Sequence, residues 1–336
     1  MNTEILKIFE KAYAGINLSK QECIRLLSLD DTSREALIMR SAASDIIRSR
    51  NDNTGVVFGQ IGLECSPCDG NCSFCSFARE YTGMAELKLD DAAIADSTVN
   101  FTRGDDLYGL YLMTMADYDL EDYLHAIEVV KKNKTGSTKL FTNVGDTSYE
   151  DFCQIKAAGI DGVYHCWRLG EGKDTRISPE RRKETVYNAK KAGLDYLDAL
   201  EPIGPEHTPE EMAEHIFFSI EMGSIQCGAM KRVPVPGTPF ENIPAISDFT
   251  LSKYIAVLVL TMAGCESMPW LAVLEPNIQG FMSGANMVCA ETGVNPRDTA
   301  EETLENRGRD VAACRQLLKE AGYQYIARGD GSRIRL

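Results

Sequence analysis

Residues 64–75 read Glu-Cys-Ser-Pro-Cys-Asp-Gly-Asn-Cys-Ser-Phe-Cys and directly follow a strand-like apolar run at 56–63. Within this segment Cys68, Cys72 and Cys75 form a C-x3-C-x2-C pattern. A short loop rich in Gly, Asn and Asp can wrap until three thiolates face one small inorganic cluster, which a regular helix or strand cannot arrange. The alternative is a zinc site, but zinc prefers four protein ligands in paired knuckles, and no second C-x2-C or H-x3-H pair follows downstream. The pattern therefore predicts an iron–sulfur cluster directly after the first strand.

Strand-like runs continue to alternate with amphipathic helices beyond this segment. With the run at 56–63, the expected strands are 107–113, 138–143, 162–167, 195–200, 224–233, 270–274 and 285–289. The helices between them are well marked, for example 148–158 and 179–192, each followed by a glycine. Such alternation indicates parallel βαβ units, and eight of them close into an α/β fold, the complete (βα)8 TIM-type barrel, with its active site at the C-terminal ends of the strands. Residues 1–50 are expected to form an N-terminal helical extension and 51–336 the barrel, within one structural domain.

Composition narrows the class of protein. The chain has 336 residues and a formal net charge of −15, which opposes binding to phosphate backbones, so we expect no nucleic-acid partner. The N-terminus lacks the basic start and apolar stretch of an export signal, and the longest apolar run, 254–264, is about half of the ~20 residues that a membrane helix needs. These features predict a cytoplasmic protein with no membrane partner. In that reducing compartment, its 11 cysteines favour metal ligation over disulfides.

The cysteine motif after the first strand, with the aromatic Phe74 before its last cysteine, resembles that of the radical S-adenosylmethionine (SAM) superfamily. The resemblance covers the whole chain. It implies that Cys68, Cys72 and Cys75 hold a four-iron four-sulfur cluster whose open iron is chelated by SAM. Reduction would then release a 5′-deoxyadenosyl radical that abstracts hydrogen from a small-molecule substrate. The resemblance also implies anaerobic chemistry and an electron donor such as flavodoxin or ferredoxin, and it is compatible with a homodimer.

Further contacts to SAM are implied by position in the family pattern. Backbone carbonyls near the end of the second strand would meet its amino group, and polar side chains after the fourth and fifth strands would meet its ribose, methionyl and adenine parts. Two arginines could bind its carboxylate in bidentate fashion or could instead be surface charges. The residues are Met113, Thr114 and Met115 for the carbonyls, Arg168 and Glu171 for the polar contacts, Arg176 and Arg182 for the carboxylate, and Glu201 near the adenine.

Within the superfamily, the chain most resembles the biotin synthase branch, which also contains methylornithine synthase and the hydrogenase maturase with a complete barrel. The resemblance rests on Leu-Ser-Lys-Gln-Glu at 18–22, Gly-Thr-Pro-Phe at 237–240, Phe-Met-Ser-Gly-Ala-Asn at 281–286 and the tail 310–322. Ordinary biotin synthases hold a second, two-iron cluster with cysteines whose places here are taken by Met113 or a neighbour, Phe141 and Asp198. That cluster is therefore not expected.

Three other cysteines suggest a replacement. Cys166, Cys227 and Cys289 fall on the fourth, sixth and eighth expected strands, and inward side chains of alternate barrel strands meet in layers. We therefore expect them to hold an auxiliary iron–sulfur cluster, although each could instead be a small buried hydrophobe. The expected activity is that of a radical SAM sulfurtransferase, a biotin synthase acting on dethiobiotin. The alternatives are a methylornithine synthase-like mutase, a maturase-like enzyme, and a cluster carrier or scaffold.

Overall fold

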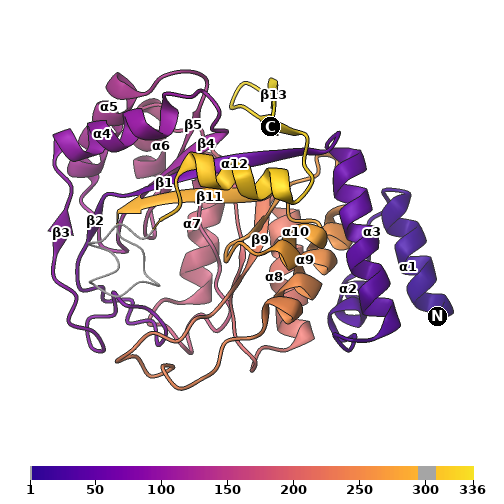
Figure 1. Ribbon diagram of the computed structural model, residues 1–336. Coiled ribbons are helices and arrows are strands. Elements are labelled where there is room, and N and C mark those ends of the chain that lie inside the picture. The colour runs from indigo at the N-terminus through magenta and orange to yellow at the C-terminus, as the bar shows by residue number, and fades with distance from the viewer. Residues whose placement is uncertain (1, 294–307) are drawn as a thin grey trace.

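The structure is a computed structural model that describes residues 2–293 and 308–336 (Figure 1). Its centre is a closed barrel of eight parallel strands, in which β11 pairs with β1 in the register Val56–Met287 and so completes the ring. The predicted (βα)8 barrel is therefore confirmed. The barrel strands are β1 (Thr54–Gly62), β4 (Gly109–Met113), β5 (Lys139–Asn143), β6 (Gly162–Tyr164), β7 (Asp195–Leu197), β9 (Gln226–Lys231), β10 (Trp270–Val273) and β11 (Met287–Gly293).

Every expected strand has a counterpart, and the differences concern strand ends. The expected strand at 195–200 is split into β7 and a separate β8 (Leu200–Ile203), which pairs with β9 after a register shift. The shift leaves Asp198 between the two strands, where its backbone N–H donates to the carbonyl of Gln226. The fourth strand stops at Tyr164, three residues earlier than expected, because the chain turns there into the loop that reaches the cysteine segment.

Helices lie between successive strands and surround the barrel. Their first turns are stabilised by Asp, Ser or Thr side chains that accept a hydrogen bond from the backbone N–H three residues later. Gly159 and Gly193 follow α6 and α7 with positive φ, as the sequence predicted. The helices are α4 (Asp91–Thr102), α5 (Leu120–Asn133), α6 (Tyr149–Ala157), α7 (Pro179–Lys191), α8 (Pro209–Glu221), α9 (Asp248–Met262) and the short α10 (Ile278–Met282).

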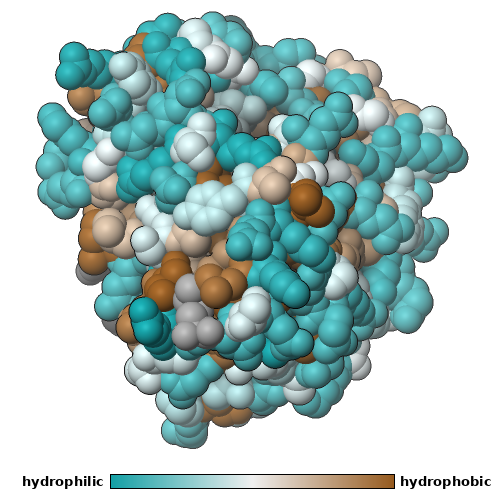
Figure 2. Space-filling view, turned by 90° about the vertical axis from the view of Figure 1, so that its right-hand side faces the viewer, coloured by the Kyte–Doolittle hydropathy of each residue, from teal (hydrophilic) through white to brown (hydrophobic). Residues whose placement is uncertain are grey.

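Three helices precede the barrel, namely α1 (Thr3–Tyr13), α2 (Lys20–Leu27) and α3 (Arg34–Arg50), and they pack against α8 and α9. Ser19 and Glu22 form a capping box at the start of α2. Figure 2 shows the face that carries these helices, which is mostly hydrophilic with a few apolar side chains among the hydrophilic ones. After the barrel, α12 (Val311–Glu320) leads to β12 (Tyr325–Ala327) and β13 (Arg333–Arg335), and β12 pairs with the first residues of β1. No helix among the described residues is long and apolar enough to cross a membrane.

Aromatic rings occupy part of the barrel interior. Phe58 stacks on Tyr111 and Phe141 with ring centroids 5.2 and 5.6 Å apart, and Tyr108 meets Trp270 edge-on at 5.7 Å. A barrel interior is a packed core rather than a pore, and these rings contribute to that packing. Open space therefore lies at the C-terminal ends of the strands.

Candidate active site

A single cavity at the C-terminal ends of the strands contains the chemistry-bearing residues. It is lined by side chains that include Gln60 on β1, Tyr111 on β4, Tyr164 on β6 and Gln226 on β9, and all three motif cysteines also line it. The two-stranded pair of β2 (Glu64–Cys65) and β3 (Leu87–Lys88) brackets the cysteine segment. The motif is therefore held over the mouth of the barrel.

Backbone donors point at two of the three sulfur atoms. The N–H of Gly70 lies 3.4 Å from the Sγ of Cys68, and the N–H of Phe77 lies 3.4 Å from the Sγ of Cys75. Such hydrogen bonds stabilise the thiolate form and tune an iron–sulfur cluster. A Cβ at Gly70 would lie 3.3 Å from the Cys68 sulfur, so a larger residue there would crowd the sulfur.

The loop after β6 fixes the cysteine loop from one side. The carbonyl of Asp174 accepts the N–H of Ser73 at 2.8 Å, and the carbonyl of Gly70 accepts the N–H of Arg176 at 2.9 Å. These bonds connect two loops that are about 100 residues apart in sequence, so the positions of the cysteines depend on the fold as a whole.

Burial disfavours free thiolates at the motif. Burial raises the pKa of Cys72 to about 11, although nearby Arg168 acts in the opposite direction, and burial likewise raises the pKa of Cys75. Metal binding supplies the positive charge that deprotonates such thiols. Cys65, by contrast, donates to the carbonyl of Ala85 at 3.5 Å and packs beneath the loop without lining the cavity.

A network of buried and partly buried charges forms one wall of the cavity. Arg168 Nε lies 3.3 Å from one oxygen of Glu201, whose other oxygen accepts the hydroxyl of Tyr164 at 2.7 Å. Glu171 accepts both the Arg168 backbone N–H at 3.1 Å and Arg182 Nε at 3.2 Å. The carboxylates therefore fix both arginines before any ligand arrives.

Asp146 completes this network from the loop after β5. Its Oδ1 lies 3.1 Å from His165 Nε2 and 3.2 Å from Arg182 Nη1, and it accepts the Thr185 hydroxyl at 3.2 Å. Burial alone would raise the pKa of Asp146, but the hydrogen bond from His165 and the charge of Arg182 outweigh it and hold the pKa below its usual range. Burial lowers the pKa of His165. No sequence pattern indicated Asp146 as part of this wall.

The predicted SAM contacts fall into three groups. Met113, Thr114, Met115, Arg168, Arg182 and Glu201 line the cavity. Glu171 is buried behind the two arginines that it binds. Arg176 is not in the cavity: its guanidinium pairs with Glu80 at 2.6 Å on the surface, with 56% of its side chain exposed. The surface alternative is therefore the observed one for Arg176, because its backbone faces the cysteine loop and its side chain faces solvent.

The three cysteines expected to hold an auxiliary cluster do not converge. Cys166 and Cys289 line the cavity, but Cys227 points from β9 toward α8, where the hydroxyl of Ser219 lies 3.7 Å from its sulfur. Neighbouring side chains on a strand face opposite sides. Gln226 occupies the inward position and accepts the hydroxyl of Tyr111 at 3.2 Å. The expected three-cysteine arrangement is therefore corrected to two cavity thiols and one outward thiol.

Comparison with known proteins finds relatives that are similar over most of the chain. No protein-family model matches the chain. The curated biotin synthase of Brachyspira hyodysenteriae is 21% identical over 96% of this chain and 95% of the relative, and that of Aquifex aeolicus is 23% identical over 94% and 95%. The biotin synthase of Clostridium tetani is 25% identical over 76% of this chain and 81% of the relative.

Two solved structures share the fold over almost the whole chain. Methylornithine synthase superposes with a TM-score of 0.78 at 18% identity, covering 96% of this chain and 98% of that one. The FeFe-hydrogenase maturase HydG from Carboxydothermus hydrogenoformans superposes with a TM-score of 0.79 at 17% identity, covering 97% and 80%. The cysteine motif after β1, the closed barrel and the similarity to curated biotin synthases over almost the whole chain together support a radical SAM, biotin synthase-like protein.

Proposed function

We propose that this radical SAM enzyme inserts sulfur into dethiobiotin to form biotin. The observation that carries the proposal is the similarity to curated biotin synthases, which extends over 94–96% of the chain for two of them. The cavity supports the radical chemistry, since motif cysteines and buried polar groups line one space at the C-terminal ends of the strands.

The cysteine loop fits a four-iron four-sulfur cluster. Cys68, Cys72 and Cys75 would hold three irons, and backbone N–H groups already point at two of the sulfurs. When bound, the cluster and SAM supply the reductive cleavage that produces the 5′-deoxyadenosyl radical. The protein's own part is to position these groups and to exclude water from the barrel interior.

The remaining wall fits SAM. The segment Met113 to Met115 offers backbone groups beside the motif, and Arg168 and Arg182 offer guanidinium groups that are already fixed by carboxylates. Because such charged side chains are already ordered, they lose little conformational entropy when they bind a ligand. Arg176 has no place in this proposal, since it lies on the surface.

The barrel interior beneath the motif would receive the substrate. Tyr111, Gln226, Leu274 and Met287 line it, which gives a mostly apolar pocket with a few hydrogen-bonding groups. Small-molecule sites commonly have this character. Dethiobiotin, with an apolar chain and a polar ring, matches that composition.

The source of the inserted sulfur differs from the one expected from the sequence. A cluster held by Cys166, Cys227 and Cys289 does not fit, because Cys227 faces α8. Cys166 and Cys289 remain as the two thiols of that set in the cavity. Sulfur insertion therefore needs a second cluster with other ligands beside these two, or a different donor.

The same observation favours a second candidate, a mutase like methylornithine synthase. A mutase rearranges its substrate without a sulfur donor, so the outward position of Cys227 is compatible with that activity. The fold likeness to methylornithine synthase, which covers 96% of this chain, is compatible with that candidate.

Anaerobic reconstitution tests both candidates. The wild-type protein should bind SAM and convert it to 5′-deoxyadenosine, and the Cys68→Ala, Cys72→Ala, Cys75→Ala triple variant should not. A protein that binds iron but not SAM would instead be a cluster carrier. With dethiobiotin present, mass spectrometry should detect biotin.

Iron counting and Mössbauer spectroscopy on the triple variant then separate the two enzymes. Remaining iron that is lost when Cys166 and Cys289 are also replaced supports sulfur insertion from a second cluster. A triple variant without iron, together with no biotin, favours the mutase.

A further inference from the structure

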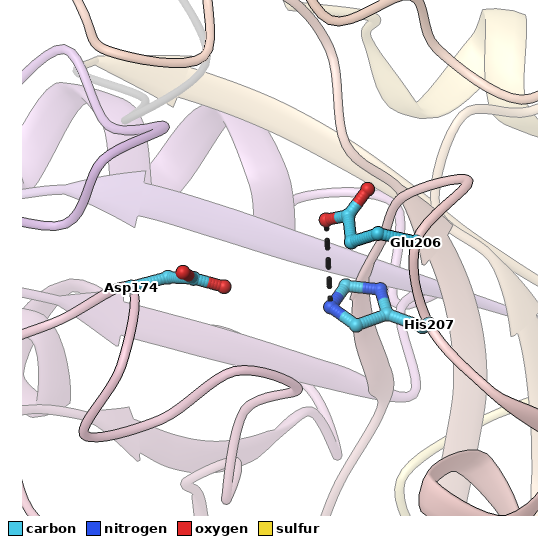
Figure 3. Close-up of side chains that lie close together, drawn as sticks. All are labelled: Asp174, Glu206 and His207. Atoms are coloured by element: carbon cyan, nitrogen blue, oxygen red, sulfur yellow. Dashed lines mark ion pairs between the residues drawn. The ribbon is translucent and has the colours of Figure 1, made fainter.

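A second polar cluster lies apart from the motif cysteines, in the loops that follow β6 and β8. Asp174 belongs to the first loop, and Glu206 and His207 belong to the second. Figure 3 shows the three side chains pointing toward one another across the gap between the loops. One nitrogen or oxygen atom from each lies within 4.8 Å of the other two. None of these three residues lines the cavity described above.

His207 is the unusual member of this cluster. Only 4% of its side chain is exposed, and its Nε2 lies 3.7 Å from Glu206 Oε1. In the described part of the chain this nitrogen has no hydrogen-bond partner. Buried polar atoms nearly always have a partner, so an unpartnered one that faces two carboxylates indicates a missing group.

The surroundings carry excess negative charge. Asp174 and Glu206 are joined by Glu211, which acts on His207 electrostatically and accepts the N–H of Gly170 at 3.2 Å. The buried guanidinium of Arg232 binds both oxygens of Glu206 and also acts electrostatically on Asp174. Even with the exposed Lys173 included, the carboxylates outnumber the cations.

Burial disfavours the charged forms of Asp174 and His207. It raises the pKa of Asp174 and lowers the pKa of His207. Gly170 lets the carboxylate come close, since a Cβ at that position would lie 2.2 Å from Asp174 Oδ2. A bound cation would favour the charged carboxylate and would take the neutral imidazole as a ligand.

We propose that Asp174, Glu206 and His207 bind one divalent transition-metal cation of the Mn²⁺ or Zn²⁺ type. One imidazole nitrogen with two carboxylates is a ligand set that suits these ions, whereas Mg²⁺ and Ca²⁺ prefer oxygen ligands alone. Glu206, with 33% of its side chain exposed, leaves a path for the ion and room for coordinated water. The site goes beyond the proposed radical chemistry and does not depend on it.

Metal binding at His207 would break one hydrogen bond of the imidazole ring. The N–H of Gly204 donates to His207 Nδ1 at 2.9 Å, which places the ring proton of the neutral imidazole on Nε2. A metal on Nε2 moves that proton to Nδ1, so the Gly204 bond must break and the ring must turn slightly. Losing one hydrogen bond is a smaller effect than gaining three ligand bonds to a cation, and the return bond from the N–H of His207 to the carbonyl of Gly204 is retained.

The bound ion would brace the rim of the active-site cavity. The carbonyl of Asp174 accepts the N–H of Ser73 in the cysteine loop, and Glu206 binds Arg232, which lines the cavity. An ion between Asp174 and Glu206 would therefore connect the support of the cysteine loop to the cavity wall.

Mn²⁺ is the probe of choice, because cysteine thiols bind it weakly and its free form is counted directly by electron paramagnetic resonance. Titration of the reconstituted protein should show one Mn²⁺ bound per chain. Asp174→Asn and His207→Gln should each weaken binding by about tenfold or more. Glu210→Gln is the matched control, since it removes an exposed carboxylate from the start of α8, and it should leave the affinity unchanged.

Electron spin-echo modulation of the bound Mn²⁺ should report one imidazole nitrogen, and this signal should disappear in His207→Gln. Circular dichroism checks that both variants remain folded. The proposal is overturned if no Mn²⁺ binds, which would leave a bridging water as the partner of Nε2, or if binding is the same in Asp174→Asn as in the control. Loss of SAM cleavage would not bear on either result, because the readout is metal binding.

Discussion

Replacing Asp146 by Asn tests whether the buried charge network holds the cofactor side of the cavity together. The substitution keeps the shape of the side chain but removes its negative charge. In the wild type that charge faces Arg182 at 3.2 Å and His165 at 3.1 Å, with Arg181 Nε 3.3 Å from its second oxygen. Only 9% of the Asp146 side chain and 5% of the Arg182 side chain are exposed, so solvent screens these contacts little.

The expected loss of stability follows from these contacts. Removing one partner of a buried ion pair costs ~3–5 kcal/mol. Glu171 still faces Arg182 in the variant, so we expect the lower end, about 3 kcal/mol. An unfolding entropy of ~2.1 cal/mol/K per residue gives about 0.7 kcal/mol/K for a chain of this length, so the thermal midpoint should fall by about 4 °C.

The dependence on pH gives an independent check. The folded chain holds the pKa of Asp146 below its usual range. The stabilisation that the Asp146 carboxylate provides is therefore complete above the unfolded pKa of ~3.9 and is lost as the pH falls toward the folded pKa. Scanning calorimetry at neutral pH, with Asp122→Asn as the control in the exposed Lys88 pair, measures the difference. The control should change stability by less than ~1 kcal/mol. If the thermal midpoint of Asp146→Asn equals that of this control, the buried charge network does not stabilise the fold as described above.

Three further outcomes are expected. Cys227→Ala should leave the iron content of the reconstituted protein unchanged, because the thiol packs against α8, and colorimetric iron analysis checks this. Arg176→Ala should change the SAM dissociation constant by less than about twofold, whereas Arg168→Ala should weaken binding by about tenfold or more in equilibrium dialysis, since only the second guanidinium lines the cavity. Burial raises the pKa of Asp198 to about 7. As the pH rises from about 4 to about 7, Asp198 therefore ionises in the unfolded chain before it does so in the folded chain, and the stability of the wild type falls. Asp198→Asn should reduce that fall in thermal midpoints measured across this range, and an unchanged pH dependence would refute the assignment.

The barrel could be predicted because its signals are local. Strand runs, helix caps and glycines after helices recur in order, and the capping box of Ser19 and Glu22 forms as its spacing indicates. The split between β7 and β8 could not be predicted in this way. It depends on the N–H of Asp198 reaching the carbonyl of Gln226 on another strand, and no pattern within 195–203 records that contact.

The inward or outward direction of a side chain was harder to predict than the strand that carries it. Parallel barrel strands are buried on both faces, so they lack the apolar-polar alternation that marks an inner face. On β9 the polar Gln226 faces the cavity and the less polar Cys227 faces α8, each with a hydrogen-bond partner. Hydropathy alone therefore gave no reason to separate Cys227 from Cys166 and Cys289.

Buried arginines explain how an acidic chain builds a cavity for a charged cofactor. A guanidinium stays protonated in proteins, so it can be buried only with a carboxylate or an equivalent partner. Three arginines that line the cavity follow this rule, and each pair joins two different loops, helices or strands of the rim. The pairs are Arg168 with Glu201, Arg182 with Glu171 and Asp146, and Arg232 with Glu206. Family position indicated two of the arginines but could not indicate all of their partners, because the partners come from different strand ends that only the closed barrel brings together. The same pairing fixes the arginines in place, so a ligand carboxylate that displaces water from them meets guanidinium groups whose orientation is already set.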